Sequence, residues 1–289
     1  MKKNENLLNL MYIPAIIMFC SFIVYPFLKG IKISFTDWNG YSQNYNYIGF
    51  DNFKLLVTDK NVRIAFINTL IYGFGSTAIQ QILGLLYALL LNNKFKGRNL
   101  GRTIIYMPVL ISAVIMGYMC YFIFRYDNGA LNDLLKLIGM EPRLWLSQPK
   151  TAIVILVLIN SIQFVGISMI IYLAGLQGIP TMYYEASEID GATAFQQFKK
   201  ITLPLLYPAI VTSVTLNLIG GLKLFDIIKA LTNGGPGYAT HSLSTLVHSE
   251  VFLTQVAGYA STIGILLFVS ILIVTLITQL YFKRKEVEY

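Results

Sequence analysis

The chain has 289 residues, of which 55% are hydrophobic and 12% are charged, and its formal net charge is +8. Soluble domains carry about 25% charged residues, so the composition excludes most soluble classes and indicates an integral membrane protein. The basic residues flank apolar stretches and form no single stripe, so the positive charge does not indicate nucleic-acid binding.

Six apolar stretches are long enough to cross a bilayer, which takes about 20 helical residues. The first could also be a signal peptide, but its length, Pro26 and the lack of a small-x-small cleavage site favour a retained helix. The sequence therefore predicts an all-α, polytopic membrane protein with a single domain, 1–289. The predicted spans are 10–28, 65–91, 103–124, 151–176, 205–227 and 257–282.

Polar segments connect these spans. Lys29–Ile64 is too long for a tight turn, and we expect it to fold as a small cap. Arg125–Lys150 contains a short predicted helix around Leu131–Ile138, and Lys229–Val256 is predicted as a loop that holds the Gly234-Gly235-Pro236 turn. An even number of spans places both termini on one side of the membrane. The termini, the 92–102 segment and the 177–204 segment together hold half of the Lys and Arg residues. The positive-inside rule therefore predicts that both termini are cytoplasmic.

The few cysteines and histidines indicate neither an enzyme nor a metal site. Cys20 and Cys120 lie inside apolar stretches, so we expect buried, unreactive thiols. His241 and His248 lie seven residues apart without a Cys or carboxylate cluster beside them, so no zinc site is expected. A membrane enzyme would need a clustered nucleophile, base or metal set, which these residues do not supply.

The polar segment 177–204 has the pattern of two short helices. Helix formers fill Thr181–Asp190, and Gly191 follows, the residue type that most easily takes the left-handed turn after a helix. Thr193 and Gln196 form a predicted capping box that starts a second helix, which Pro204 ends or bends. Phe195, Phe198 and Ile201 recur at helical spacing and predict one apolar face.

Polar residues inside two spans are candidates for a substrate path. Asn160 and Gln163 share one face of the fourth span, and Asn217, Gly221 and Leu224 share one face of the fifth. Helix–helix hydrogen bonds are an equally good reading of the three amides. Phe225 adds an aromatic side chain that can stack on an apolar ring face of a ligand. Lys223 and Asp226 lie three residues apart near the end of the fifth span. A structural ion pair between them is favoured over a role in the substrate path.

The spacing in the 177–204 segment resembles the EAA loop of membrane subunits of binding-protein-dependent ABC importers. The match comprises Glu185-Ala186-Ser187, Gly191 after three residues, and Ile201-x-Leu203-Pro204 after nine more, with Ser187 in place of the usual alanine. Further motifs resemble the carbohydrate branch that includes the maltose and glycerol-3-phosphate permeases. They are Tyr25-Pro26, Tyr47–Phe53, Phe225-Asp226 and Leu231–Pro236.

This resemblance implies that the segment is a cytoplasmic coupling loop that docks on an ATPase. Glu185 would pair with a basic residue there, Ala186 and Ser187 would allow close approach, and Gly191 would set the angle between the helices. In the spans, Asn160 and Asn217 match polar sugar contacts of the maltose permease, whereas Gly221 and Leu224 replace asparagines. The coupling residues implied are Tyr184, Glu185, Ala186, Ser187, Asp190, Gly191, Ile201, Leu203 and Pro204.

The resemblance also implies the partners and the location. No G-x-x-x-x-G-K-[ST] motif occurs, so ATP and Mg²⁺ are expected on a separate ATPase and no cofactor on this chain. The implied assembly contains a second permease subunit, two ATPase subunits and an extracytoplasmic binding protein that delivers a carbohydrate, in a bacterial cytoplasmic membrane. A glycerol-3-phosphate or other small-solute permease stays open as an alternative, and so does an ion-coupled secondary transporter.

Overall fold

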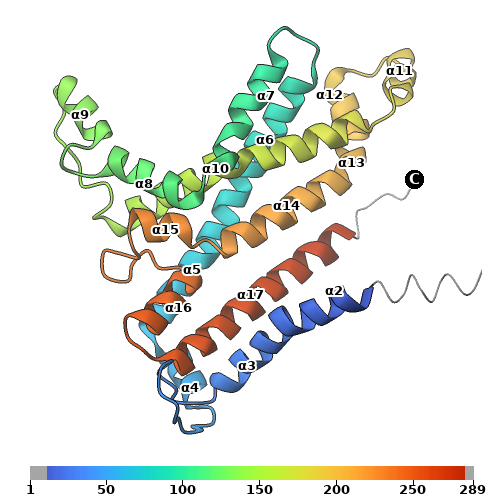
Figure 1. The fold of residues 1–289 in the computed structure, drawn as a ribbon. Coiled ribbons are helices and arrows are strands. Elements are labelled where there is room, and N and C mark those ends of the chain that lie inside the picture. The colour runs from blue at the N-terminus through green and yellow to red at the C-terminus, as the bar shows by residue number, and fades with distance from the viewer. Residues whose placement is uncertain (1–11, 284–289) are drawn as a thin grey trace, which may run out of the picture. The chain divides into compact units, whose positions relative to one another are not determined.

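The computed structural model describes residues 12–283, and these residues are predominantly helical (Figure 1). Their β structure is a single antiparallel bridge between Thr36 and Tyr47. The contacts divide the described chain into two compact units, 12–62 with 246–267 and 63–245 with 268–283. The prediction of an all-α protein is confirmed.

The smaller unit begins with one continuous helix, Tyr12–Ile33, made of α2 (Tyr12–Phe19), a π-helical turn (Cys20–Val24) and α3 (Tyr25–Ile33). None of its most apolar window is buried within the chain, and Cys20 is exposed, so the prediction of a buried thiol is wrong for Cys20. A helix of 22 residues whose 18-residue apolar window is left unburied by the described residues must face lipid or another subunit, because water does not solvate so large an apolar surface favourably.

The predicted cap at 29–64 is ordered by hydrogen bonds within this unit. It contains α4 (Asp51–Thr58), and the Asn52 side chain donates to the carbonyls of Ser34 and Thr36, each at 2.9 Å. The backbone N–H of Gly258 donates to the Trp38 carbonyl at 2.8 Å, and the Tyr259 hydroxyl donates to Asp59 at 2.7 Å. These bonds fix the polar segment on the first turn of the last helix.

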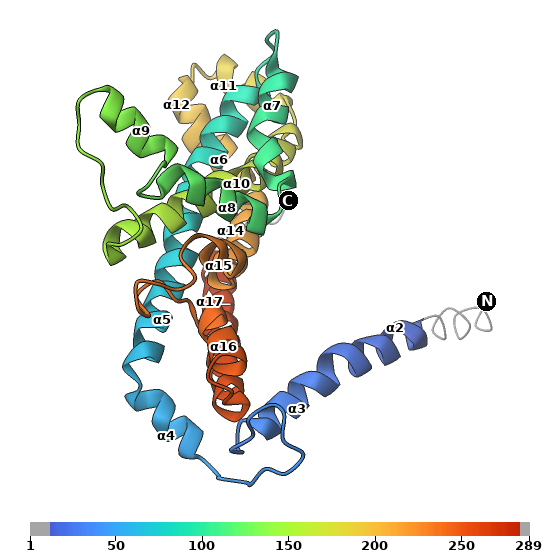
Figure 2. The same ribbon diagram turned by 60° about the vertical axis from the view of Figure 1, so that its left-hand side comes forward.

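In the larger unit, the central helix α10 packs against α6 and α14 (Figures 1 and 2). Its most apolar window is 61% buried, because small residues let its neighbours approach closely. The elements after α4 are α5 (Lys60–Leu70), η2 (Ile71–Gly75), α6 (Ser76–Asn92), α7 (Arg98–Tyr106), η3 (Met107–Leu110), α8 (Ala113–Phe124), α9 (Ala130–Leu137), α10 (Pro149–Gln177), α11 (Met182–Ile189), α12 (Ala194–Gln197), η4 (Phe198–Thr202), α13 (Leu203–Leu205), α14 (Tyr207–Leu222), α15 (Asp226–Leu231), α16 (Leu243–Phe252) and α17 (Ala257–Lys283).

Two of the six predicted spans are broken. Among the described residues, four helices are long and apolar enough to cross a membrane, and the number rises to six when each bent pair counts as one span. The third predicted span, 103–124, bends by 96° where Ile111 and Ser112 take extended backbone between η3 and α8. The fifth, 205–227, follows a bend of 64° at Leu206, where Pro204 and Pro208 each remove a helical donor.

The ends of several helices differ from the predicted ends of the spans by a few residues. The first described span runs to Ile33, the second begins at Lys60, and α14 ends at Leu222, before the predicted end of the fifth span. The short helix predicted around Leu131–Ile138 is confirmed as α9. The segment 229–256 is more than a loop, because α16 fills much of its second half.

A buried polar network holds the turn between α15 and α16. Asn68 donates to the carbonyls of Ala239 and His241, and the Tyr72 hydroxyl donates to the carbonyl of Thr240. The imidazole of His241 lies 3.0 Å from the Thr245 hydroxyl, and an added Cβ at Gly234 would overlap the ring. Gly234 therefore has to be glycine, both for this contact and for its φ of +87°.

Acidification should destabilise this turn. Burial, with a smaller contribution from Lys229, lowers the pKa of His241 below its ordinary value. The unfolded chain then binds a proton more readily than the folded one, so the contribution of the neutral ring is complete above about pH 6.5 and is lost as the pH falls below it. We expect the thermal midpoint of the purified protein to fall between pH 7.5 and 5.5. The His241→Gln variant should show a smaller fall, and an equal fall in both proteins would contradict the assignment.

Candidate substrate pocket and coupling hairpin

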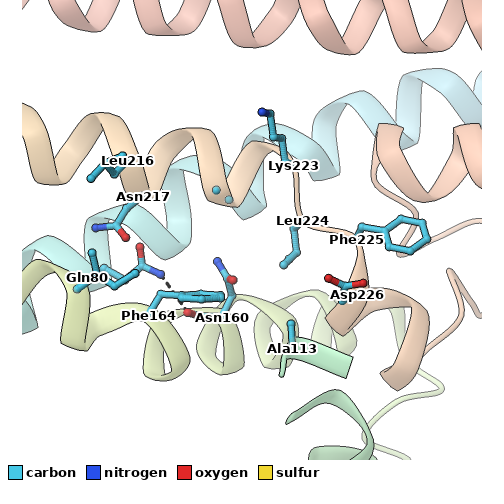
Figure 3. A pocket seen from close by; sticks show the side chains of 13 residues that line it. Gln80, Ala113, Asn160, Phe164, Leu216, Asn217, Lys223, Leu224, Phe225 and Asp226 are labelled. Carbon is cyan, nitrogen blue, oxygen red and sulfur yellow. Dashed lines mark hydrogen bonds between the residues drawn. The ribbon is translucent and has the colours of Figure 1, made fainter. Parts of the chain in front are cut away.

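A cavity of about 320 Å³ lies among α6, α8, α10, α14 and the segment that follows α14 (Figure 3). Its walls combine three side-chain amides with two phenylalanines and one residue of each charge. The lining residues are Gln80, Ala113, Asn160, Phe164, Ile167, Leu216, Asn217, Gly220, Gly221, Lys223, Leu224, Phe225 and Asp226.

Five of the six residues predicted for the substrate path line this cavity. Gln163 does not, because its amide points to the broken third span and donates to the Ile111 carbonyl at 2.9 Å. Gly221 also has a packing role, since an added Cβ would come within 2.9 Å of the Gly73 Cα. The close approach of α14 to η2 therefore requires glycine at this position.

The amides of the cavity have unused hydrogen-bonding capacity. Gln80 donates to the Asn160 carbonyl at 3.0 Å, while its own side-chain oxygen is buried and accepts no hydrogen bond from the described residues. Asn160 is 2% exposed, and its side chain makes no hydrogen bond with the described residues. Asn217 donates to the Ser168 hydroxyl at 2.6 Å, which leaves its oxygen available. Buried amides without partners cost about 1–3 kcal/mol each, so a polar ligand that satisfies them would be stabilised.

Gln80 was missed by the sequence reasoning. Gln80 and its neighbour Gln81 are polar residues inside an apolar span, which is the same signal that pointed to Asn160 and Asn217. The sequence does not say which face of the second span turns toward α10 and α14, and that orientation decides whether Gln80 reaches the cavity.

Lys223 and Asp226 line the cavity without pairing. Both are exposed, the described residues contain no ion pair between them, and Figure 3 shows the Lys223 side chain pointing away from Asp226. The expectation of a structural ion pair is wrong. The reason is local: Lys223 is the residue that follows the last turn of α14 and Asp226 begins α15, so the two residues do not share one helix face.

The 177–204 segment forms the two short helices predicted, α11 and α12, with Gly191 at a φ of +73° between them. The capping box of Thr193 and Gln196 is present. Ser187 ties the helices together, because its hydroxyl donates to the Tyr184 carbonyl at 2.8 Å and accepts from Gln197 at 3.0 Å. A serine at this position therefore adds a bond that alanine cannot make.

The hairpin presents acidic and apolar side chains that residues 12–283 leave uncovered. Glu185, Ala186 and Asp190 are exposed, and Glu185 makes no ion pair with the described residues. Large apolar side chains surround them, with Ile189 at 88% and Phe195 at 72% exposure. The Tyr184 hydroxyl instead faces inward, 2.9 Å from the Thr202 hydroxyl. Ile201, Leu203 and Pro204 are half-buried at the base of the hairpin.

Exposed apolar side chains around an acid, at the end of a membrane helix, are typical of a docking surface. The loop between α6 and α7 lies at the same end of this unit as the hairpin (Figures 1 and 2). That loop contains Lys94 and Lys96 and no acidic residue, and Arg98 begins α7 directly after it, so positive charge gathers at this end.

Residues 80–287 match the family model described as the binding-protein-dependent transport system inner membrane component. The chain belongs to this family. It is therefore a multi-pass membrane permease subunit of an ABC importer, a transport subunit and not an enzyme. In importers of this family the ATPase is a separate subunit.

The chain is also similar to individual members along almost its whole length. It is 33% identical to the probable starch degradation products permease AmyD of Thermoanaerobacterium thermosulfurigenes, with 95% of this chain and 93% of that protein covered. It is 34% identical to the trehalose/maltose permease MalF of Thermococcus litoralis, with 93% and 90% covered. The chain is also similar in structure to one chain of a bacterial alginate ABC transporter, which was solved in complex with a periplasmic protein bound to an alginate pentasaccharide. The two chains superpose with a TM-score of 0.84 at 28% identity, and the match covers 98% of this chain and 96% of that one.

Proposed function

We propose that this permease forms half of the translocation pathway for a carbohydrate, most simply an oligosaccharide, delivered by an extracytoplasmic binding protein. The observation that carries the proposal is the cavity at α10 and α14 with its unsatisfied amides. Amide groups donate to and accept from hydroxyls, while Phe164 and Phe225 offer apolar faces to a sugar ring. The similar permeases named for starch products and for trehalose and maltose support the same class of substrate.

Lys223 is the observation that favours the alternative substrate, glycerol-3-phosphate, because a phosphate would be attracted to a cation in the path. Asp226 lines the same cavity and opposes that attraction. A phosphate carries more than one negative charge near pH 7, so a single lysine opposite a carboxylate is a poor match for it. The cavity therefore fits a polyhydroxylated solute better than a phosphate ester.

In the proposed assembly a second permease subunit completes the pathway and two ATPases bind ATP and Mg²⁺ at the cytoplasmic face. The α11–α12 hairpin docks on one ATPase, and both termini of the chain lie on that side. Closure of the ATPase pair moves the docked hairpins together, and the spans open outward to accept sugar. The exposed Glu185, Ile189 and Phe195 and the basic α6–α7 loop support this orientation.

Removing an amide from the cavity should weaken transport. We expect Asn160→Ala and Gln80→Leu each to lower the uptake of a saccharide such as maltotriose by roughly ten- to a hundredfold at limiting substrate, because one lost hydrogen bond costs about 1–3 kcal/mol. Asn99→Ala, on the exposed side of α7, is the matched control and should transport normally. Uptake of glycerol-3-phosphate but of no saccharide by the intact importer would contradict the proposed substrate class.

The positive φ of Gly191 gives a second test, this one of the hairpin geometry. An added Cβ at Gly191 meets nothing within 4 Å, so substitution acts through the backbone alone. Gly191→Val should lose most ATPase-coupled uptake, because a β-branched residue is strained at a φ of +73°. Gly191→Asn should retain much of it, since asparagine tolerates the left-handed region. Equal uptake by both variants would mean that the turn geometry does not matter for coupling.

A further inference from the structure

A second cavity, of about 520 Å³, lies at the end of α10 opposite the hairpin and has no part in the function proposed so far. It is formed by the chain between α8 and α10 together with the first turn of α10. Aromatic and apolar side chains share its walls with donors and acceptors, and the one charged lining residue is Arg143. The lining residues are Tyr126, Pro142, Arg143, Leu144, Trp145, Gln148 and Thr151.

One buried side chain builds the wall of this cavity. Asn132 of α9 is fully buried, and its amide donates to the carbonyls of Tyr126 at 3.2 Å and Arg143 at 3.0 Å. Its oxygen accepts from the Arg143 backbone N–H at 3.0 Å and from the Trp145 indole at 2.8 Å. With its hydrogen-bonding capacity filled, Asn132 holds the backbone at Arg143 and the indole of Trp145 in one orientation.

Arg143 is the group in this wall with donors to spare. Its guanidinium lies 5.9 Å from the centre of the Trp145 ring, and it makes no hydrogen bond or ion pair with the described residues. Arg125 nearby is occupied, because its guanidinium donates to the Asn128 carbonyl. A planar guanidinium with free donors is the side chain best suited to bind a carboxylate with two parallel hydrogen bonds.

The cavity favours a small ligand over a protein surface. Its volume is within the roughly 300–1,000 Å³ of small-molecule sites, and it combines aromatic side chains with a few polar groups that are exposed to an incoming ligand. Aromatic walls suit a sugar ring, Gln148 and Thr151 suit hydroxyls, and Arg143 suits an acid. Thr151 precedes Asn160 by nine helical residues, so the two cavities lie about 14 Å apart along α10.

We propose that this second cavity binds an acidic saccharide unit through Arg143, against the wall that Asn132 fixes, on the way to the inner pocket. The passage to the inner pocket rests on the proposed carbohydrate import, whereas binding at Arg143 can be measured without it.

The test uses tryptophan fluorescence of the purified importer. The sequence has two tryptophans, so Trp38→Phe leaves Trp145 as the reporter in this chain, and the same importer with Trp145→Phe corrects for the partner subunits. We expect trigalacturonate to quench this signal saturably and to bind at least tenfold more tightly than maltotriose. Arg143→Gln should abolish the preference for the acid, and Arg143→Lys should retain part of it, because it keeps the charge without the planar fork.

Three outcomes decide the proposal. If trigalacturonate still quenches Trp145 in the Asn160→Ala variant while that variant's saccharide uptake falls, the acid binds at Arg143 independently of the inner pocket. No quenching by either trisaccharide, or equal quenching in Arg143→Gln, overturns the proposal. Quenching of Trp145 by the partner binding protein alone, dependent on Arg143, overturns it in favour of a protein-docking role for the cavity.

Discussion

Replacing Glu185 by lysine should abolish uptake while the chain stays inserted in the membrane. Glu185 is exposed on α11 and makes no ion pair with the described residues, so the substitution removes no internal interaction. On the proposed docking surface it meets a basic residue of the ATPase. Reversing a charge in a desolvated interface converts an attraction into a repulsion and costs several kcal/mol, which is a loss of more than a hundredfold in affinity.

The measurement is co-purification of the ATPase with a tagged permease, together with saccharide uptake. Glu141→Lys changes the same residue type to the same charge at an exposed position in the α9–α10 segment, and it should keep both the ATPase and the uptake. A Glu185→Lys complex that keeps its ATPase and transports normally would remove the hairpin from the coupling mechanism. An absence of the chain from the membrane fraction would point to a folding role instead.

Adding one methyl group at Gly84 should destabilise the core of the larger unit. An alanine Cβ there would overlap the Ser168 Cβ and lie 3.1 Å from the Met169 backbone nitrogen, so neither neighbour can move as a flexible side chain would. The helices α6 and α10 would have to separate along their contact. Overpacking of this kind costs about 1–3 kcal/mol, and a larger residue such as leucine should prevent assembly of the two helices.

Thermal unfolding of the purified protein in detergent measures this effect. We expect Gly84→Ala to lower the midpoint by several degrees and Gly84→Leu to lower the yield of folded protein severely. Gly264→Ala is the control, because an added Cβ at Gly264 meets nothing within 4 Å. An unchanged midpoint for Gly84→Ala would mean that α6 and α10 are not held at the distance described. The same separation would also displace Gln80 from Asn160, so uptake should fall with stability.

The two short helices of the hairpin follow from local chemistry alone. Gly191 takes the left-handed turn because only glycine adopts it without strain, and the Thr193 and Gln196 side chains satisfy donors that lie within three residues of them. The apolar spans are predictable for a similar reason, since hydropathy depends on composition within a window and not on distant contacts.

The tertiary structure decided what depends on distant contacts. The break at Ile111 and Ser112 interrupts an apolar run that hydropathy reads as continuous, and the amide of Gln163, from another span, occupies the Ile111 carbonyl that the break frees. Gln80 reaches the cavity because Gly84 and Gly221 let three helices approach closely, and a linear pattern cannot show which faces meet. The sequence therefore determined the membrane class, the two-helix hairpin and the family resemblance, because each rests on short-range pattern. Packing between helices far apart in the chain determined the composition of the inner cavity, whereas the second cavity is built within residues 126–151 around Asn132.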